Sequence, residues 1–212
     1  QALADNGSLS EAAEHIRQVL QRYPDNFQAR LLYNRILMRS AAASGRDNAA
    51  ALQEIEANLE TLDQEAADSL ELSMLRLQLL MTKNQLDKAE ELITQLQQKH
   101  PSNVELQLEK ANVLFLQGHT DEAIDILRKC ADQNPRRIDP VRYHAILLAQ
   151  QQQYDQCEKI VKAALDRMDD PRETRQLGLL LSDVYFRSDQ PDKAYELLTG
   201  LTEELPQDVP LK

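Results

Sequence analysis

The 212-residue chain is 42% hydrophobic and 28% charged, a composition typical of a globular protein, and good helix formers such as leucine, alanine, glutamine and glutamate dominate it. Its net charge of −11 disfavours nucleic acids and anionic membrane surfaces, because their phosphates attract lysine and arginine. The two cysteines form no CxxC motif and indicate neither a disulfide framework nor a zinc site, and no apolar run approaches the roughly 20 residues that span a bilayer.

The first helix is predicted over 9–23, after a polar turn near Gly7 and before the helix-ending Pro24. It reads as the second helix of a hairpin whose partner is mostly missing, so the first unit, about 1–26, is partial. We therefore expect the chain to be a fragment of a longer array. The next unit, 27–68, matches the pattern weakly and carries extra length around 43–48.

Four further units are predicted at 70–103, 104–137, 138–171 and 175–208. Most units contain a polar turn, then a small residue, then a proline about twelve residues later. The small residues are Ala12, Ala51, Ala89, Ala123, Cys157 and Ala194. We interpret them as helix crossings, where a larger side chain would overpack the interface.

The residue two positions before the small one is interpreted as an N-cap, whose side-chain oxygen accepts a backbone N–H. These predicted caps are Ser10, Asp87, Asp121, Asp155 and Asp192. Proline is interpreted as the end of the second helix, with Pro171 coming slightly late. Gly118 is predicted to close the first helix of its pair in a left-handed conformation.

A period near 34 with two helices and these markers resembles the tetratricopeptide repeat family. The residues that carry the resemblance best are Ala111, Leu114, Gly118, Ala123, Leu127 and Pro135. The resemblance covers nearly the whole chain, but no unit has the family's first-helix tryptophan, and bulky Leu77 stands where the family prefers a small residue. It implies an all-α, right-handed superhelical solenoid of antiparallel helix pairs. We expect about five to six repeats, with a truncated first one, in one domain over 1–212.

In this family the first helices of the pairs line a concave groove, where a peptide or partner protein binds. The positions that the resemblance assigns to this groove are Arg35, Met38, Arg39, Met74, Gln78, Met81, Leu108, Asn112, Phe115, Arg142, Tyr143, Ile146, Leu179, Asp183 and Phe186. Met38, Met81, Phe115, Ala149 and Phe186 share one register. This apolar stripe is either a docking strip or packing between neighbouring first helices.

Some family members hold a peptide carboxylate with a clamp of lysine, asparagine and arginine. Asn112 and Arg142 stand at plausible clamp positions, but the matching lysines are absent, so we expect no clamp. The segment 47–75 is acidic and contains no Lys or Arg, while Arg128, Lys129, Arg136, Arg137 and Arg142 form a basic patch. These are either solvated outer faces or complementary surfaces for a basic partner or for head-to-tail self-association.

We expect a binding module and no enzyme, because the four histidines lie in different units and no phosphate-binding loop is present. No cofactor or metal is expected, and Cys130 and Cys157 are interpreted as small buried hydrophobes. The expected function is a protein–protein interaction scaffold. The alternatives are a helical-repeat RNA-binding module, which the charge disfavours, and an accessory domain of an enzyme. The high glutamine content suggests a bacterial source, in the cytoplasm or the envelope.

Overall fold

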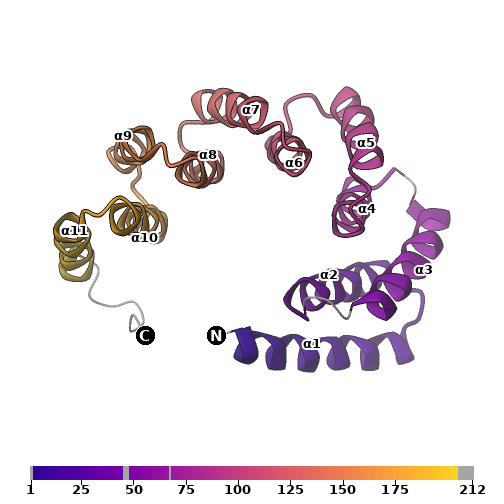
Figure 1. The fold of residues 1–212 in the computed structure, drawn as a ribbon. Helices are drawn as coiled ribbons and strands as arrows, with labels where there is room; N and C mark the ends of the chain where they lie inside the picture. Colours follow the sequence, from indigo (N-terminus) through magenta and orange to yellow (C-terminus); the bar gives the residue numbers. More distant parts are fainter. Residues whose placement is uncertain (1, 45–47, 67, 205–212) are drawn as a thin grey trace. The chain divides into compact units, whose positions relative to one another are not determined.

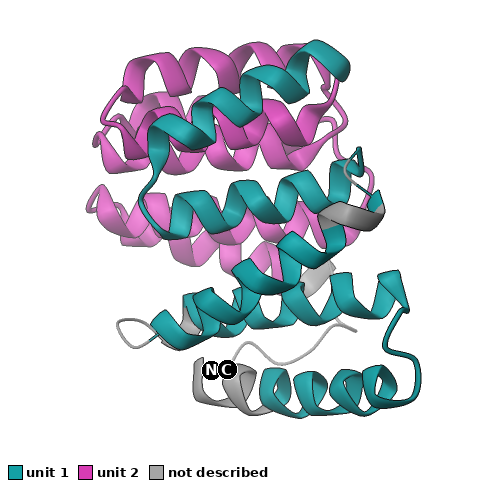
Figure 2. Cartoon of the chain, turned by 90° about the vertical axis from the view of Figure 1, so that its right-hand side faces the viewer, with its two compact units in different colours: residues 1–101 teal, residues 102–212 magenta. Residues whose placement is uncertain are grey.

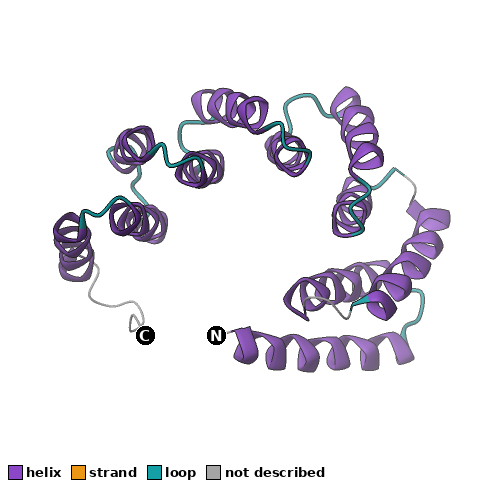
Figure 3. Ribbon diagram, in the orientation of Figure 1, coloured by secondary structure: helices purple, strands orange, loops and turns teal. Residues whose placement is uncertain are grey.

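The computed structural model describes residues 2–44, 48–66 and 68–204, which form eleven α-helices and no strand (Figures 1 and 3). In chain order the helices are α1 (Ala2–Arg22), α2 (Phe27–Ser44), α3 (Ala49–Ala66), α4 (Leu70–Thr82), α5 (Leu86–Lys99), α6 (Val104–Leu116), α7 (Thr120–Gln133), α8 (Ile138–Gln150), α9 (Tyr154–Leu165), α10 (Pro171–Arg187) and α11 (Pro191–Glu204). The predicted all-helical class is confirmed. No helix in the described ranges is both long and apolar enough to cross a membrane.

The chain divides into two compact units, residues 1–101 and residues 102–212 (Figure 2). In unit 1, α1 packs on α2, α2 on α3, α3 on α4 and α4 on α5. In unit 2, each helix from α6 to α11 packs on the next, and α8 also packs on α10. A single helix is thus followed by five consecutive helix pairs, as predicted. The superhelical coiling and the single domain stay predictions.

In the four pairs from α4 to α11, a left-handed residue closes the first helix. Asn84, Gly118, Gln152 and Asp189 all have φ between 55° and 88°. Around Gly118 its own N–H donates to Phe115 O at 3.0 Å, and the next N–H donates to Leu114 O at 2.8 Å. These two bonds satisfy carbonyls that the helix end would leave unpaired. The left-handed conformation predicted for Gly118 is confirmed.

The predicted N-caps of the second helices are wrong. Asp87, Asp121, Asp155 and Asp192 lie in the first turns of α5, α7, α9 and α11. The left-handed turn brings the chain into the helix two residues earlier than the sequence pattern indicated. Their carboxylates still stabilise the positive helix N-terminus through its dipole. Ser10 lies inside α1, since the good helix formers around it continue the helix across the predicted turn.

Side-chain caps occur instead at α2, α4, α6 and α10, the first helices of four pairs, whereas Arg137 before α8 forms no such bond. The carboxamide or hydroxyl oxygens of Asn26, Ser69 and Asn103 accept backbone N–H groups at 2.9, 3.3 and 2.9 Å. Asp170 accepts the N–H of Arg172 at 2.7 Å, which places Pro171 at the start of α10. The interpretation of Pro171 as a helix end is therefore wrong. A proline suits the first turn, where its missing N–H leaves no bond unmade.

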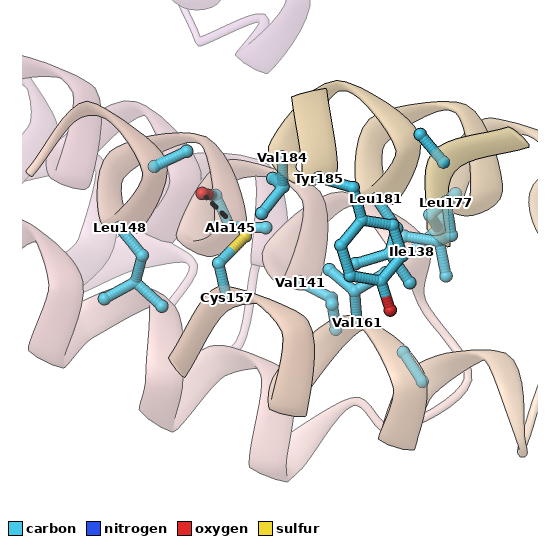
Figure 4. Packing of buried hydrophobic residues seen from close by; sticks show 13 residues of the cluster. Ile138, Val141, Ala145, Leu148, Cys157, Val161, Leu177, Leu181, Val184 and Tyr185 are labelled. Atoms are coloured by element: carbon cyan, nitrogen blue, oxygen red, sulfur yellow. Dashed lines mark hydrogen bonds between the residues drawn. The ribbon is translucent and has the colours of Figure 1, made fainter. Parts of the chain in front are cut away.

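The small residues of the second helices pack at buried crossings. Ala89, Ala123, Cys157 and Ala194 have no exposed surface. Figure 4 shows the α8–α9 crossing, where the Cys157 thiol donates to the backbone oxygen of Ala145 at 3.4 Å. Such a direct contact between side chain and backbone requires small residues on both helices.

Two of the predicted crossing residues, Ala12 and Ala51, are only partly buried. In α3 the side chains of Ile55 and Leu62 have no exposed surface, and Ile55 stands 34 residues before Ala89, in phase with the later repeats. The assignment of the crossing to Ala51 is therefore wrong. The crossing position of α3 holds a large residue, so a sequence pattern based on small residues does not detect it.

The two units differ in what fills their cores. The α2–α4 cluster of unit 1 consists of large apolar side chains, namely Leu31, Met38, Ile55, Leu59, Leu62, Leu72, Leu75 and Leu79. The cluster of α8–α11 in unit 2 mixes large residues with Ala145, Ala149, Cys157, Ala164 and Ala194 (Figure 4).

Unit 1 also buries one polar side chain. Asn34 has no exposed surface, and its Nδ2 donates to Arg30 O at 2.8 Å. Its Oδ1 accepts the Asn58 amide at 3.1 Å, so both sides of the buried amide are hydrogen-bonded. A buried amide with both groups bonded avoids most of the cost of leaving water.

Candidate functional site

An apolar pocket lies between α6, α7 and α8 in unit 2. It is small and open to solvent, and the free space of about 240 Å³ over its lining residues includes that open solvent. Its lining residues are Leu108, Ala111, Asn112, Phe115, Leu127, Tyr143 and Leu147. Four of these, Leu108, Asn112, Phe115 and Tyr143, were assigned to the groove from the sequence, and the structure brings them together.

Helical spacing explains why these side chains meet. Leu108, Asn112 and Phe115 are separated by four and three residues, so they lie on one face of α6. Leu127 and Leu147 are buried and form the floor with Ala111, whereas Asn112 and Tyr143 are exposed at the rim. The pocket therefore has an apolar base and a polar edge, the arrangement typical of a ligand site.

A carboxyl group adjoins this pocket. Glu109 is half-buried on α6, and it accepts a hydrogen bond from the side chain of Asn112. Burial raises the pKa of Glu109, and the Asn112 bond opposes that rise. The site thus holds a carboxyl group whose ionised form is poorly solvated.

Arg142 lies beside the pocket on α8 and is already engaged. One of its terminal nitrogens is 3.1 Å from the Asp139 carboxylate, and its guanidinium lies 5.3 Å from the centre of the Tyr143 ring. Arg137 pairs with Glu105 at 2.8 Å and with Asp139 at 3.5 Å. These contacts fix Arg142 next to the pocket rim.

In unit 1 the predicted groove residues are distributed differently. Arg35, Arg39 and Gln78 are exposed, and Met74 and Met81 are half-buried. Met38 is buried within the α2–α4 cluster, which agrees with the packing alternative for this member of the stripe. The predicted groove positions of unit 1 are therefore divided between the surface and the core.

The remaining groove residues of unit 2 lie outside the pocket. Ile146 is half-buried, and Asp183 is exposed and pairs with Arg187 at 2.8 Å. Phe186 is 47% exposed, and its ring meets that of Tyr195 edge to face at 5.9 Å. Leu179 is also exposed, whereas Ala149, the stripe member between Phe115 and Phe186, is buried. The exposed stripe is therefore interrupted.

Several charges of the acidic segment are paired inside unit 1. Lys83 contacts Glu56 at 2.8 Å, Lys99 contacts Asp68 at 2.9 Å, and Glu54 accepts the hydroxyl of Tyr33 at 2.8 Å. Asp47 lies outside the described residues. In the basic patch, Arg128 pairs with Asp125 at 2.7 Å. Self-association through these patches stays a prediction.

The cysteines are buried, as predicted. Burial raises the pKa of the Cys157 thiol to about 11 and that of Cys130 in the same direction, so both remain protonated near neutral pH. His144 is also buried, and burial, with a smaller contribution from Arg128, lowers its pKa. In the described ranges, no group of three or more His, Cys, Asp and Glu side chains is placed to hold a metal ion.

Sequence reasoning missed the pocket floor and its carboxyl neighbour. Leu127 was named only as a marker of the repeat, and Leu147 was not singled out, although both line the pocket with Ala111. Glu109 stands directly after a predicted groove residue. Its isolation from cations becomes visible only when the neighbouring helices are in place.

Comparison with known proteins agrees with this architecture. A family model described as anaphase-promoting complex, cyclosome, subunit 3 matches residues 82–164. No curated protein matches the chain.

Three solved structures illustrate the similarity of fold. A thermophilic TPR protein of Thermus thermophilus, TTC0263, has 17% identity and a TM-score of 0.61, over 86% of this chain and 93% of that chain. A tetratricopeptide repeat protein of Parabacteroides merdae ATCC 43184 has 18% identity and a TM-score of 0.57, over 95% and 75%. MamA from residue 41 to its end, of Desulfovibrio magneticus RS-1, has 16% identity and a TM-score of 0.55, over 85% and 98%.

Proteins built from tetratricopeptide repeats generally mediate protein–protein interactions and are typically non-catalytic. The sequence markers, the consecutive helix pairs and these matches agree, and they confirm that the chain has the fold of tetratricopeptide repeat proteins.

Proposed function

We propose that the chain is a protein–protein interaction scaffold, and that its α6–α8 pocket binds an apolar side chain of a peptide or partner protein. The observation that carries this proposal is the pocket itself, with Leu127 and Leu147 at its floor and Leu108 and Phe115 on its α6 wall. Burying an apolar side chain there removes apolar surface from water, which favours binding.

The polar rim supports a peptide ligand in particular. Asn112 and Tyr143 place an amide and a phenol at the pocket edge, where a peptide backbone needs hydrogen-bonding partners. The hydrogen bond between Asn112 and Glu109 holds the amide before a ligand arrives. A preorganised rim lowers the entropy cost that binding imposes on the protein.

A selection experiment tests the proposal. Peptides are selected from a displayed random library against the whole chain, and their Kd values are measured by fluorescence anisotropy on Leu108→Glu and on Leu116→Glu. Both changes add a carboxylate to α6, but Leu116 is 48% exposed and does not line the pocket. We expect Leu108→Glu to weaken binding about tenfold or more, and Leu116→Glu to leave the Kd nearly unchanged.

Two further variants extend the test. Phe115→Glu alters the same pocket, whereas Met81→Glu alters the same register in unit 1. Circular dichroism checks that each variant keeps its helix content. Selected peptides that bind every pocket variant as tightly as the original chain would show that the pocket is not the binding site.

A further inference from the structure

Glu109 does not line the pocket, but its carboxyl group is hydrogen-bonded to a residue of the pocket rim. It follows the pocket residue Leu108 directly, and its carboxyl group accepts a hydrogen bond from Asn112 at the pocket rim. A ligand group that contacts Asn112 at the rim is therefore separated from this carboxyl group by one hydrogen-bonded side chain.

Among the described residues of α6–α8, several carboxylates pair with an arginine, whereas Glu109 forms no ion pair. Glu105 pairs with Arg137 at 2.8 Å, Asp139 with Arg142 at 3.1 Å, and Asp125 with Arg128 at 2.7 Å. Among the residues that the structure describes, no basic side chain forms an ion pair with Glu109, and a hydrogen bond from a neutral amide is its polar contact.

A half-buried carboxylate without a cation is unfavourable, because it has lost part of its hydration and gained no opposite charge. The raised pKa of Glu109 reflects this imbalance. A ligand that brings a positive charge to this point would complete the ion pair. The net charge of the chain, −11, would also attract a basic ligand over longer range.

We infer that the pocket recognises a peptide segment in which a lysine or arginine lies next to the apolar anchor residue, and that Glu109 pairs with this basic side chain. This inference rests on the proposed function, since it requires that the pocket hold the anchor. Glu109 then determines which apolar peptides bind, while the pocket supplies the apolar contact that all of them share.

Short labelled peptides with one central leucine in an alanine–serine background provide the probe. One lysine is moved through the positions around the leucine, and matched peptides carry acetyl-lysine, which keeps the side-chain length without the charge. Anisotropy titrations compare the original chain with Glu109→Gln, which preserves shape, and with Glu122→Gln. Glu122 is an exposed α7 glutamate outside the pocket.

We expect at least one lysine position to bind about three- to tenfold more tightly than its acetyl-lysine partner. Glu109→Gln should remove this preference, and Glu122→Gln should keep it. Equal binding of lysine and acetyl-lysine peptides, or a lysine preference that survives Glu109→Gln, would overturn the inference.

The Leu108→Glu variant separates this inference from the function on which it rests. If Leu108→Glu abolishes binding of all leucine peptides but no lysine preference exists, the pocket function stands and the role of Glu109 is rejected. If no peptide binds in a way that depends on Leu108, the proposed function fails, and the inference fails with it.

Discussion

The buried crossing of the α2–α3 pair in unit 1 holds larger side chains than the crossings of unit 2. On the first helices, the crossing residue lies four positions before each residue of the apolar stripe and is fully or nearly fully buried. These crossing residues are Asn34 and Leu77 in unit 1, and Ala111, Ala145 and Ser182 in unit 2. On the second helices, α3 carries Ile55, whereas α5, α7, α9 and α11 carry Ala89, Ala123, Cys157 and Ala194.

This difference shows two ways of packing the same helix pair. In unit 2, small residues on both helices allow direct approach of the backbones, as the contact between Cys157 and Ala145 illustrates. In the α2–α4 cluster, large side chains fill the space themselves, and α2 and α3 are longer helices, with 18 residues each. The α2–α4 cluster should therefore be more sensitive to truncation of its crossing residue, and the crossings of unit 2 should be more sensitive to enlargement.

The largest effect is expected from Ile55→Ala in unit 1. Because Ile55 has no exposed surface, its truncation should leave a cavity and lower the free energy of unfolding by about 2–5 kcal/mol. Hydrogen exchange measured by mass spectrometry should show the loss of protection in α2–α4. Leu52→Ala, at a half-buried position of the same helix, serves as the control and should cost less. If Ile55→Ala left the free energy of unfolding unchanged, this result would contradict the packing described for the α2–α4 cluster.

Enlargement should be harmful in unit 2. Ala123→Ile places a branched side chain at a crossing without free space, and should destabilise the chain by about 1–3 kcal/mol. Urea unfolding followed by circular dichroism measures the effect. Ala163→Ile makes the same change at an exposed position of α9 and should have a much smaller effect. If both variants unfold at the same urea concentration, close approach does not distinguish the two units.

The turns offer a finer comparison, since unit 1 uses Asn84 at the position where unit 2 uses Gly118. Gly118 has φ of 88° and open space around it, so Gly118→Ala introduces backbone strain alone and should cost about 1–2 kcal/mol. Gly200→Ala lies in a helix with open space and should stabilise α11 by about 0.5–1 kcal/mol. In thermal unfolding, the melting temperature should fall for Gly118→Ala and rise for Gly200→Ala. A shift in the same direction for both variants would contradict the strain argument.

The smallest expected effect concerns pH. The fully buried polar side chain of unit 1, Asn34, does not titrate, whereas His144 in unit 2 is buried with its pKa lowered. Since folding lowers this pKa, the unfolded chain binds more protons, and stability should fall as the pH drops below about 6.5. The charged groups facing His144 are Arg128, which adds to the lowering, and Asp125 and Asp132, which oppose it.

His144→Gln provides the test of this pH dependence. Unfolding free energies measured between neutral and mildly acidic pH should fall less steeply for His144→Gln than for the original chain. Hydrogen exchange in α7 and α8 should show the same difference. An identical pH dependence in both proteins would contradict the role assigned to His144.

Helix pairing was predictable because small residues and prolines mark the repeat directly. Gly118 was correctly predicted as left-handed, because glycine is the residue that adopts a positive φ most readily. Asn84, Gln152 and Asp189 adopt the same conformation without that signal. This hidden turn is also why the aspartates that follow it were taken for N-caps when they lie inside the first helical turn.

Other features depend on tertiary packing that a single sequence does not show. The crossing at Ile55 was missed because a large residue fills a position expected to be small. In the pocket, the register predicted Leu108, Asn112 and Phe115 on α6, but the floor comes from α7 and α8, which meet α6 only in the folded chain. Glu109 could not be distinguished from the other glutamates, because its lack of a cation depends on which helices surround it.

The buried Asn34 amide constrains how α2 and α3 can slide along each other. Apolar side chains alone would accept several alignments, since leucine and isoleucine contacts are nearly interchangeable. A displacement that separated Asn34 from Asn58 would leave buried amide groups unbonded, at a cost of about 1–3 kcal/mol for each group. The pair of asparagines therefore selects one alignment in the part of the chain where the core side chains are large and least selective.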